Sequence, residues 1–162
     1  MASYQRGLAI RQAQLALDSP RLGESYRRIG ELHRRQRELD AAAAALEQAR
    51  ALQEVGALAD SVAAAATRLR LGELALDRRA ADKAREHFAR ALAIYTAHSD
   101  PDTLVVALAR FGLARALAAA AGALTPEARA LAEQALATLH ARGPGFTAEA
   151  RTIRGWLSPR GK

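Results

Sequence analysis

The stretch Phe88-Ala-Arg-Ala-Leu-Ala-Ile94 shares four of its seven residues with Tyr4-Gln-Arg-Gly-Leu-Ala-Ile10, which lies 84 positions earlier. Halfway between them, 42 residues from each, stands Leu46-Glu-Gln-Ala-Arg-Ala-Leu52, and Ala132-Glu-Gln-Ala-Leu-Ala-Thr138 follows 44 residues after Phe88. A segment that returns at a fixed interval is typical of a repeat architecture. The sequence therefore predicts a repeated unit of about 42 residues.

A second recurring pattern, an arginine, an apolar residue and a glycine, falls in the other half of each unit. It occurs as Arg28-Ile29-Gly30, Arg70-Leu71-Gly72 and Arg110-Phe111-Gly112, at intervals of 42 and 40 residues. The surrounding residues have the spacing of one helix face. In the first and last copies this stripe consists of Leu22, Tyr26, Ile29, Gly30 and His33, and of Leu104, Leu108, Phe111, Gly112 and Arg115.

A second helix is predicted in each unit, with small residues where another helix must come close. Its recurring positions are Ala42, Leu46 and Ala49, then Ala84, Phe88 and Ala91, then Ala128, Ala132 and Ala135. Short polar turns at residues 37–40 and 77–79 join the two helices of a unit. Breaks at residues 18–20, 54–56 and 98–101 separate the units. Each unit is thus expected to form a helical hairpin.

Gly30 and Gly72, each followed by the small and apolar positions of its second helix, resemble the Leu-Gly … Ala-x-x-x-Phe … Ala signature of the tetratricopeptide repeat (TPR) family. The resemblance covers residues 4 to about 140. The unit is longer than that family's standard of about 34 residues, and is similar to the long-period repeats of kinesin light chains and many bacterial regulators. Arg68 stands at the usual large apolar position of its first helix, and Ala132 replaces the aromatic residue of the last repeat. Generic antiparallel helices are the alternative interpretation.

The resemblance implies an all-α fold, a right-handed αα superhelix of about eight helices, in a single domain over residues 1–162. The expected parts are the second helix of a truncated repeat at 3–17, repeats at 20–54, 58–97 and 102–140, and a C-terminal capping helix at 146–158.

The two ends of the chain carry their own predictions. Tyr4 occupies the place of Phe88, so the first helix of the opening repeat is missing. Either the chain is a fragment of a longer protein, or another surface covers the apolar stripe that includes Tyr4, Leu8 and Ile10. At the other end Thr147 is predicted to cap the last helix. The apolar side of that helix is formed by Phe146, Ile153, Trp156 and Leu157.

The composition narrows the class of protein. There is no Cys, which excludes disulfides and thiolate metal sites. The net charge is +7, with 22 arginines against Lys83 and Lys162. This skew reflects a GC-rich coding sequence more than phosphate binding, so nucleic acid is not the expected partner. The longest low-charge run, residues 116–126, is too short to cross a bilayer, and no signal-like segment follows Met1. We expect a cytoplasmic protein with no membrane partner.

The arginine triplets predict the binding site. Successive helical residues are rotated by about 100°, so the arginine and the glycine of a triplet face nearly opposite directions. If the glycine faces the paired helix, then Arg28, Arg70 and Arg110 line the concave surface of the array as a column. Neighbouring helices pack about 8–10 Å apart, which suits an acidic peptide with a carboxylate at about every third residue.

The alternative interpretation is that these arginines bind no partner and only form ion pairs with nearby acids. Arg28 has Glu24 and Glu31 within reach along its helix, and Arg70 has Glu73. Arg110 has no acid three or four positions away, so it is the leading candidate to contact a partner. The remaining predicted contacts are Arg27 and Arg34, which add positive charge, and Leu113, which adds apolar surface beside Arg110.

Catalysis finds little support in the sequence. His33, His87, His98 and His140 include no pair with the i, i+4 spacing of a helical metal site. His33 falls on a packed stripe and is interpreted as a partly buried core residue. No Ser lies in a Gly-x-Ser-x-Gly context, and the glycines at 143–145 lack the Lys-Ser/Thr ending of a phosphate loop. We therefore expect no enzyme, no cofactor and no metal.

The expected function is a scaffold that binds a partner peptide or protein, with an acidic one favoured, in the concave groove. Two alternatives remain open at this stage. One is a self-association module of a larger bacterial signalling or regulatory protein, forming a homodimer through the N-terminal helix. The other is an RNA-binding helical repeat, which would need a continuous arginine face with stacking aromatics. An array of this composition is similar to repeat regions appended to bacterial serine/threonine kinases and transcriptional regulators.

Overall fold

The structure, a computed structural model, describes residues 20–98, 100 and 103–158. These residues form α-helices, two short 3-10 helices and connecting turns, and they contain no strand, so the expected all-α fold is confirmed. The described part holds seven α-helices rather than eight. The helix expected at residues 3–17, with Tyr4, Leu8 and Ile10, lies outside the described residues.

The helices follow the residue ranges that the sequence predicts for the repeated units. The full set is α2 (Pro20–Arg35), α3 (Leu39–Gln53), η1 (Gly56–Asp60), α4 (Val62–Asp77), α5 (Ala81–His98), α6 (Leu104–Ala121), α7 (Pro126–Ala141), η2 (Pro144–Phe146) and α8 (Thr147–Leu157). Each of the ranges 20–54, 58–97 and 102–140 holds two α-helices, with α5 and α7 ending one residue beyond the expected limit.

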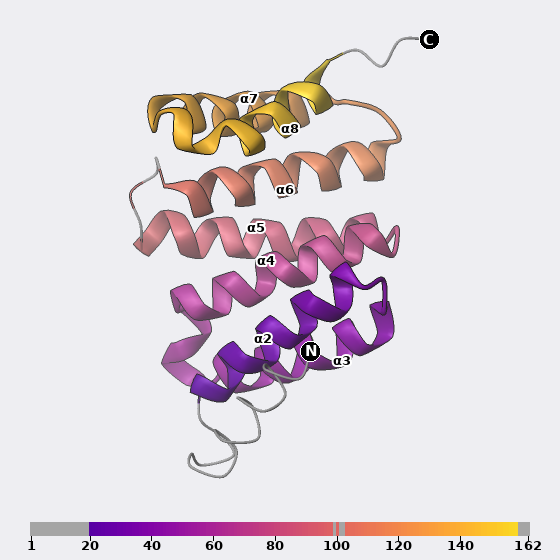
Figure 1. Cartoon of the computed structure of the whole chain (residues 1–162), viewed down its shortest axis with the longest axis vertical. Helices are drawn as coiled ribbons and strands as arrows, with labels where there is room; N and C mark the ends of the chain where they lie inside the picture. The colour runs from indigo at the N-terminus through magenta and orange to yellow at the C-terminus, as the bar shows by residue number, and fades with distance from the viewer. Residues whose placement is uncertain (1–19, 99, 101–102, 159–162) are drawn as a thin grey trace.

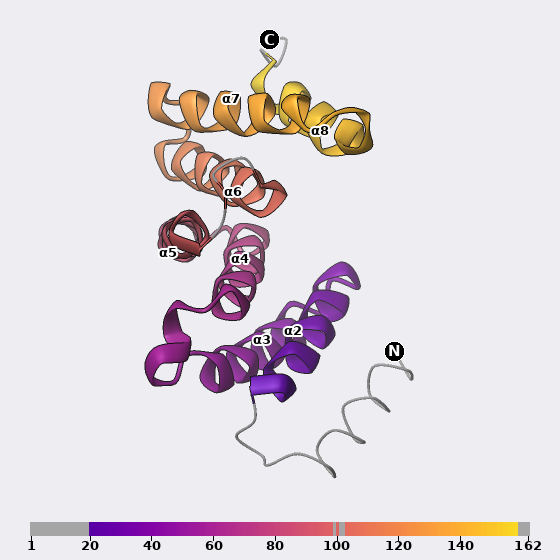
Figure 2. The same ribbon diagram turned by 90° about the vertical axis from the view of Figure 1, so that its left-hand side faces the viewer.

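Helices that are neighbours in sequence are neighbours in space. Each packs against the next and runs in the opposite direction, so the molecule is a stack of helices along its longest axis (Figure 1). In addition, α2 contacts α4 and α4 contacts α6, so the first helices of successive hairpins touch one another. Figure 2 shows α4 and α8 on the same side of this stack.

The turn inside each hairpin passes through a residue with left-handed backbone geometry. These residues are Arg37 (φ 64°), Arg79 (φ 59°) and Gly122 (φ 67°), spaced 42 and then 43 positions apart. The backbone therefore repeats with the period of the sequence. Left-handed geometry ends a helix and reverses the chain, but this conformation is unfavourable for residues other than Gly and Asn.

Helix starts are set by hydroxyl caps at two of the hairpins. Ser61 Oγ accepts a hydrogen bond from the Ala64 amide at the start of α4, and Thr125 Oγ1 accepts one from the Ala128 amide at the start of α7, each at 3.2 Å. The capping role predicted for Thr147 is wrong. Thr147 has helical backbone angles (φ −65°, ψ −29°) and is the first residue of α8 itself, whereas an N-cap needs extended geometry.

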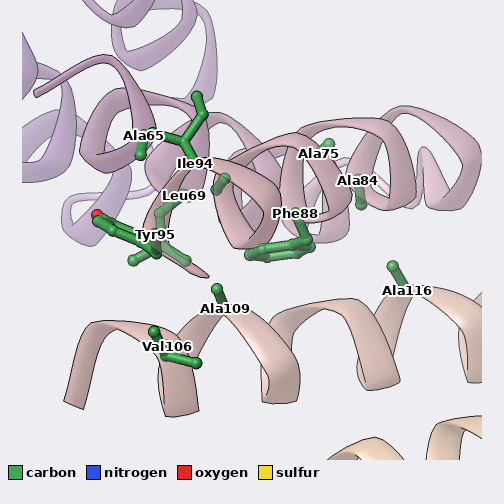
Figure 3. Close-up of a cluster of buried hydrophobic side chains, with 11 residues drawn as sticks. Ala65, Leu69, Ala75, Ala84, Phe88, Ile94, Tyr95, Val106, Ala109 and Ala116 are labelled. Carbon is green, nitrogen blue, oxygen red and sulfur yellow. The ribbon is translucent and has the colours of Figure 1, made fainter. Parts of the chain in front are cut away.

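The core consists of the small and apolar positions that recur in the second helices. All nine predicted positions are at most 1% exposed, which confirms them: Ala42, Leu46, Ala49, Ala84, Phe88, Ala91, Ala128, Ala132 and Ala135. Figure 3 shows the middle of this core, where Phe88 and Tyr95 of α5 lie against the α6 residues Val106 and Ala109. Alanines let the helix axes approach closely, and the few large rings fill the space between them.

The triplet glycines occupy three of these close approaches. A Cβ at Gly30 would lie 2.6 Å from Leu46 of α3, and one at Gly72 would lie 2.9 Å from the Phe88 ring of α5, so both glycines face the paired helix as predicted. The prediction is wrong for Gly112. A Cβ there would lie 2.3 Å from Phe88, on the helix that precedes α6 rather than on its partner α7.

Helix α6 lies between two core clusters. One of its faces contributes Val106, Ala109 and Ala116 to the cluster with α4 and α5, and another contributes Ala107 and Phe111 to the cluster with α7 and α8. By length and composition alone α6 is long and apolar enough to cross a membrane, the one such helix among the described residues. Its position between two clusters is sufficient reason for that composition.

Candidate peptide-binding surface

The first two arginines predicted to contact a partner share an acid of their own helix. Arg27 donates to Glu24 through both Nε (2.9 Å, to Oε2) and Nη2 (2.7 Å, to Oε1), and Arg28 Nε donates to Glu24 Oε1 at 2.7 Å. Arg27 is mostly buried, whereas the Arg28 side chain is 56% exposed. Glu24 thus offsets charge on both.

Arg34 and Arg70 belong to an ion-pair network that joins α2 to α4. Arg34 Nη1 donates to Asp77 Oδ2 at 2.8 Å and Arg34 Nη2 lies 3.1 Å from Glu73 Oε2, while Arg70 Nη1 donates to both Glu73 oxygens at 2.9 and 2.8 Å. Glu31 lies between the two arginines, 3.4 Å from Arg34 Nε and 3.6 Å from Arg70 Nε. The two guanidinium side chains are 21% and 26% exposed.

The network stabilises its charged forms. Burial acts to lower the pKa of Arg34 and of Arg70, but the carboxylates, Glu73 first, outweigh it and both values are raised. Burial likewise acts to raise the pKa of Glu31, and the charges of Arg70 and Arg34 reverse this, leaving it lowered. Arg34 and Arg70 are therefore held ionised by acids of the same chain.

Arg110 has different surroundings. Its Nη1 donates to Thr138 Oγ1 of α7 at 3.4 Å, so it points toward the paired helix, and the prediction that it points away is wrong. The reason is the rotation of α6: because Gly112 faces α5, the residue two positions earlier faces α7. Leu113 is partly buried against the α4–α5–α6 core cluster. Arg28, Arg70 and Arg110 consequently do not share one set of neighbours.

A pocket of about 170 Å³ opens over α6, between α4 and α8. Its apolar lining is Phe88, Leu108, Phe111, Gly112 and Ile153, and its polar lining is Glu73, Arg115, Glu149 and Thr152. These residues belong to four helices, so no single hairpin forms the pocket. Since α4, α6 and α8 all contribute, the pocket lies on the side of the stack where the first helices meet.

Phe111, in the pocket lining, is held by two ring contacts. Its ring packs edge-on against Trp156 of α8 (centroids 5.5 Å apart, planes at 85°), and the Arg115 guanidinium lies 5.8 Å from its centroid. On the rim, the Glu149 carboxylate makes no hydrogen bond or ion pair with the residues that the structure describes. The pocket therefore combines an apolar lining with acidic and basic groups.

Sequence reasoning assigned part of this pocket to packing and missed the rest. Leu108, Phe111 and Arg115 lay on the predicted stripe of the first helix, and Ile153 on the apolar side of the last. Glu149 precedes Thr152 by three positions and Ile153 by four, a spacing that places Glu149 on one helix face with each of them. That spacing was the available signal, but only the structure shows which helix α8 faces.

Two other predicted features have clear positions. Arg68, the departure from the TPR pattern, pairs with Glu54 at the end of α3: Nη2 donates to Oε2 at 2.9 Å and Nε lies 2.6 Å from Oε1. His33 is 18% exposed and its Nδ1 contacts Glu38. Within the described ranges, no three His, Asp or Glu side chains gather in a metal-binding arrangement.

A scan against protein-family models and a search of curated proteins each gave no match. The resemblance to TPR proteins therefore stands on the residues and spacings themselves.

Proposed function

We propose that the chain is a protein-binding helical array of the tetratricopeptide type, and that it binds rather than catalyses. The described helices support this through their paired order, the contacts between first helices, and left-handed turns that recur with the sequence period. A right-handed superhelix built in this way presents its first helices as a continuous groove. That groove is the proposed peptide-binding surface.

The observation that carries the proposal is the pocket over α6. A cavity of about 150 Å³ lined by apolar side chains is enough to hold benzene, so a pocket of about 170 Å³ takes one leucine or phenylalanine side chain. Such an anchor in a desolvated pocket supplies a large share of the binding energy in many interfaces. Glu149 and Arg115 at the rim can hydrogen-bond the peptide on either side of the anchor.

The acidic ligand has weaker support than the apolar anchor. Of the five arginines predicted to bind it, Arg27, Arg28, Arg34 and Arg70 contact carboxylates of their own chain. An acidic peptide would have to displace these pairs, and the desolvated ones of the α2–α4 network are the costliest to break. An acid preference of the partner is accordingly a secondary feature of this proposal.

The two rival functions make different demands. RNA binding needs a continuous arginine face, yet acids neutralise much of the arginine charge on α2 and α4. Self-association was assigned to the stripe within residues 3–17, outside the described part, and predicts a molecular mass that rises with concentration. Peptide binding predicts a loss of affinity when the pocket over α6 is filled.

Filling the pocket is the test. Thr152 is exposed at the rim, and its hydroxyl donates only to Ala148 O of its own helix (3.0 Å), so Thr152→Trp should fill the pocket without disturbing the core. Thr96→Trp is the matched control, because Thr96 is also exposed and also bonds its own helix, at Leu92 O (2.9 Å), away from the pocket. Peptides would be selected from a random display library on the purified chain, and their dissociation constants measured for both variants by fluorescence anisotropy.

Burial of one apolar side chain contributes about 1.5–3 kcal/mol. Thr152→Trp should therefore raise the dissociation constant at least about tenfold, while Thr96→Trp leaves it unchanged. Equal affinity of the two variants would contradict the proposal, as would selected peptides that share no apolar residue.

A further inference from the structure

A second pocket, of about 490 Å³, lies at the junction of α7, η2 and α8. Its lining is Leu139, His140, Gly143, Phe146, Thr147, Ala150, Arg151 and Arg154. Leu139, Phe146 and Ala150 form an apolar wall. The polar lining consists of one threonine and three basic side chains, and no acid lines the pocket among the described residues.

The basic side chains of this pocket have no acidic partner among the described residues. Arg154 Nη2 lies 2.9 Å from His140 Nε2, and because a guanidinium only donates, the ring nitrogen is the acceptor of this contact. Arg151 precedes Arg154 by three positions, which places both on one face of α8. Arg151 makes no hydrogen bond or ion pair with any residue that the structure describes. By contrast, Arg34 and Arg70 on α2 and α4 each contact two or more acids.

We propose that this pocket binds a phosphate monoester. Two arginines on one helix face offer paired donors whose geometry matches phosphoryl oxygens, and their two charges balance a dianion, whereas a carboxylate would balance only one. The wall of Leu139 and Phe146 suits the organic part of the ester.

The proposed phosphate site is separate from the pocket over α6. Glu149, Thr152 and Ile153 face the groove, whereas Thr147, Ala150, Arg151 and Arg154 face the phosphate pocket, so α8 presents a different side to each. Thr152→Trp should consequently leave phosphate binding unchanged. Failure of one proposal can thus be told from failure of the other.

Calorimetric titration of the full chain with phenyl phosphate tests the site, because the probe carries both the dianion and an apolar group. Arg154→Gln and Arg151→Gln should each raise its dissociation constant by about tenfold, since each removes a charge-assisted hydrogen bond. Arg85→Gln is the matched control: Arg85 is an exposed helical arginine on α5, 3.6 Å from Asp82 and outside the pocket. Benzoate, with the same ring and a single charge, should bind more weakly than phenyl phosphate.

The proposal is overturned if phenyl phosphate shows no saturable binding, if benzoate binds as tightly, or if Arg85→Gln weakens binding as much as the two pocket variants. Comparison with a phosphoserine peptide then identifies the source of the ester. Tighter binding of the peptide than of phenyl phosphate, lost on dephosphorylation, supports the site with a phosphorylated protein as its ligand. Equal or weaker binding of the peptide supports it with a small phosphate ester.

Discussion

Phe88 touches the glycines of two different helices. Atoms of its ring lie 2.9 Å from the position of a Cβ at Gly72 and 2.3 Å from one at Gly112, closer than two carbon atoms can approach without displacement. The ring is 1% exposed. One aromatic residue thus fixes the spacing of α4, α5 and α6, and the lack of a side chain at Gly72 and at Gly112 leaves room for its ring.

Gly112→Ala should therefore lower the free energy of unfolding by about 1–3 kcal/mol, the usual cost of overpacking a core, although alanine is the better helix former by about 1 kcal/mol. Gly155→Ala in α8 is the control, because no atom lies within 4 Å of its Cβ position, and it should stabilise the chain. Phe88→Leu combined with Gly112→Ala should show favourable coupling in a double-mutant cycle from urea denaturation. Strict additivity would mean that the ring and the glycine do not meet.

His87 on α5 is another residue whose surroundings carry a measurable consequence. Burial lowers the pKa of His87 below its ordinary value of 6.5, and the positive charge of Arg68 lowers it further. The other charged groups that act on it are Glu86 of its own helix and Glu47 and Arg50 of α3. The folded chain therefore binds a proton at His87 less readily than the unfolded chain does.

Stability should consequently fall as the pH decreases through and below 6.5, since a depressed pKa contributes stability above the unfolded value and loses it below. Between about pH 7.5 and about pH 5.5, a range above the titration of most carboxylates, the urea midpoint should decrease for the natural chain and less so for His87→Gln. Parallel profiles of the two proteins would show that His87 is not responsible.

At the scale of the helical hairpin, the left-handed turn is the feature that recurs. Arg37 and Arg79 adopt it despite carrying side chains, and Gly122 adopts it in the third hairpin. A left-handed residue other than glycine costs about 1–2 kcal/mol. The same turn therefore contains strain in two hairpins that is absent from the third.

Arg79→Gly should raise the free energy of unfolding by about 0.5–1 kcal/mol, because the relief of strain exceeds the added entropy of glycine in the unfolded chain. Gly122→Ala introduces the strain instead and should lower it by about 1 kcal/mol. Both positions are exposed, so packing contributes little to either change. Thermal or urea denaturation of the two variants provides the check, and a loss of stability in Arg79→Gly would contradict it.

The helices and the core of this fold could be predicted from local spacing, because the two depend on residues three, four and seven positions apart. The packed faces of α2 and α4 could be predicted as well, since Gly30 and Gly72 face their paired helices as the pattern requires. The rotation of α6 did not follow, because Phe88 receives glycines from both neighbouring helices and no local pattern places Gly112 against α5 rather than α7.

The pocket over α6 could not be predicted for a related reason. Its lining combines residues of four helices, from Glu73 to Ile153. In the ion-pair network, likewise, Arg34 binds Asp77, which lies 43 positions away in the sequence. Such long-range neighbours follow from helix packing angles, which small rotations change. The arginine column failed at Arg110 for this reason, whereas the ion pairs of Arg28 and Arg70 followed from acids on their own helices.

At the scale of the whole molecule, the central claim is that a partner peptide lies along the first helices and anchors a side chain over α6. The exposed apolar residues elsewhere, Val55, Leu58 and Val62 around η1, offer a different surface to a partner. These two surfaces lie in different stretches of the chain and can be told apart by where a bound peptide protects the backbone.

Hydrogen–deuterium exchange of the chain, alone and with a selected peptide, is the most direct test. The account predicts slower amide exchange in residues 108–115 of α6 and 149–153 of α8, where the peptide stabilises the helices that line the pocket. It also predicts that this protection disappears in Thr152→Trp and persists in Thr96→Trp. Protection confined to residues 55–62, or unchanged exchange in α6 and α8 when the peptide is bound, would contradict it.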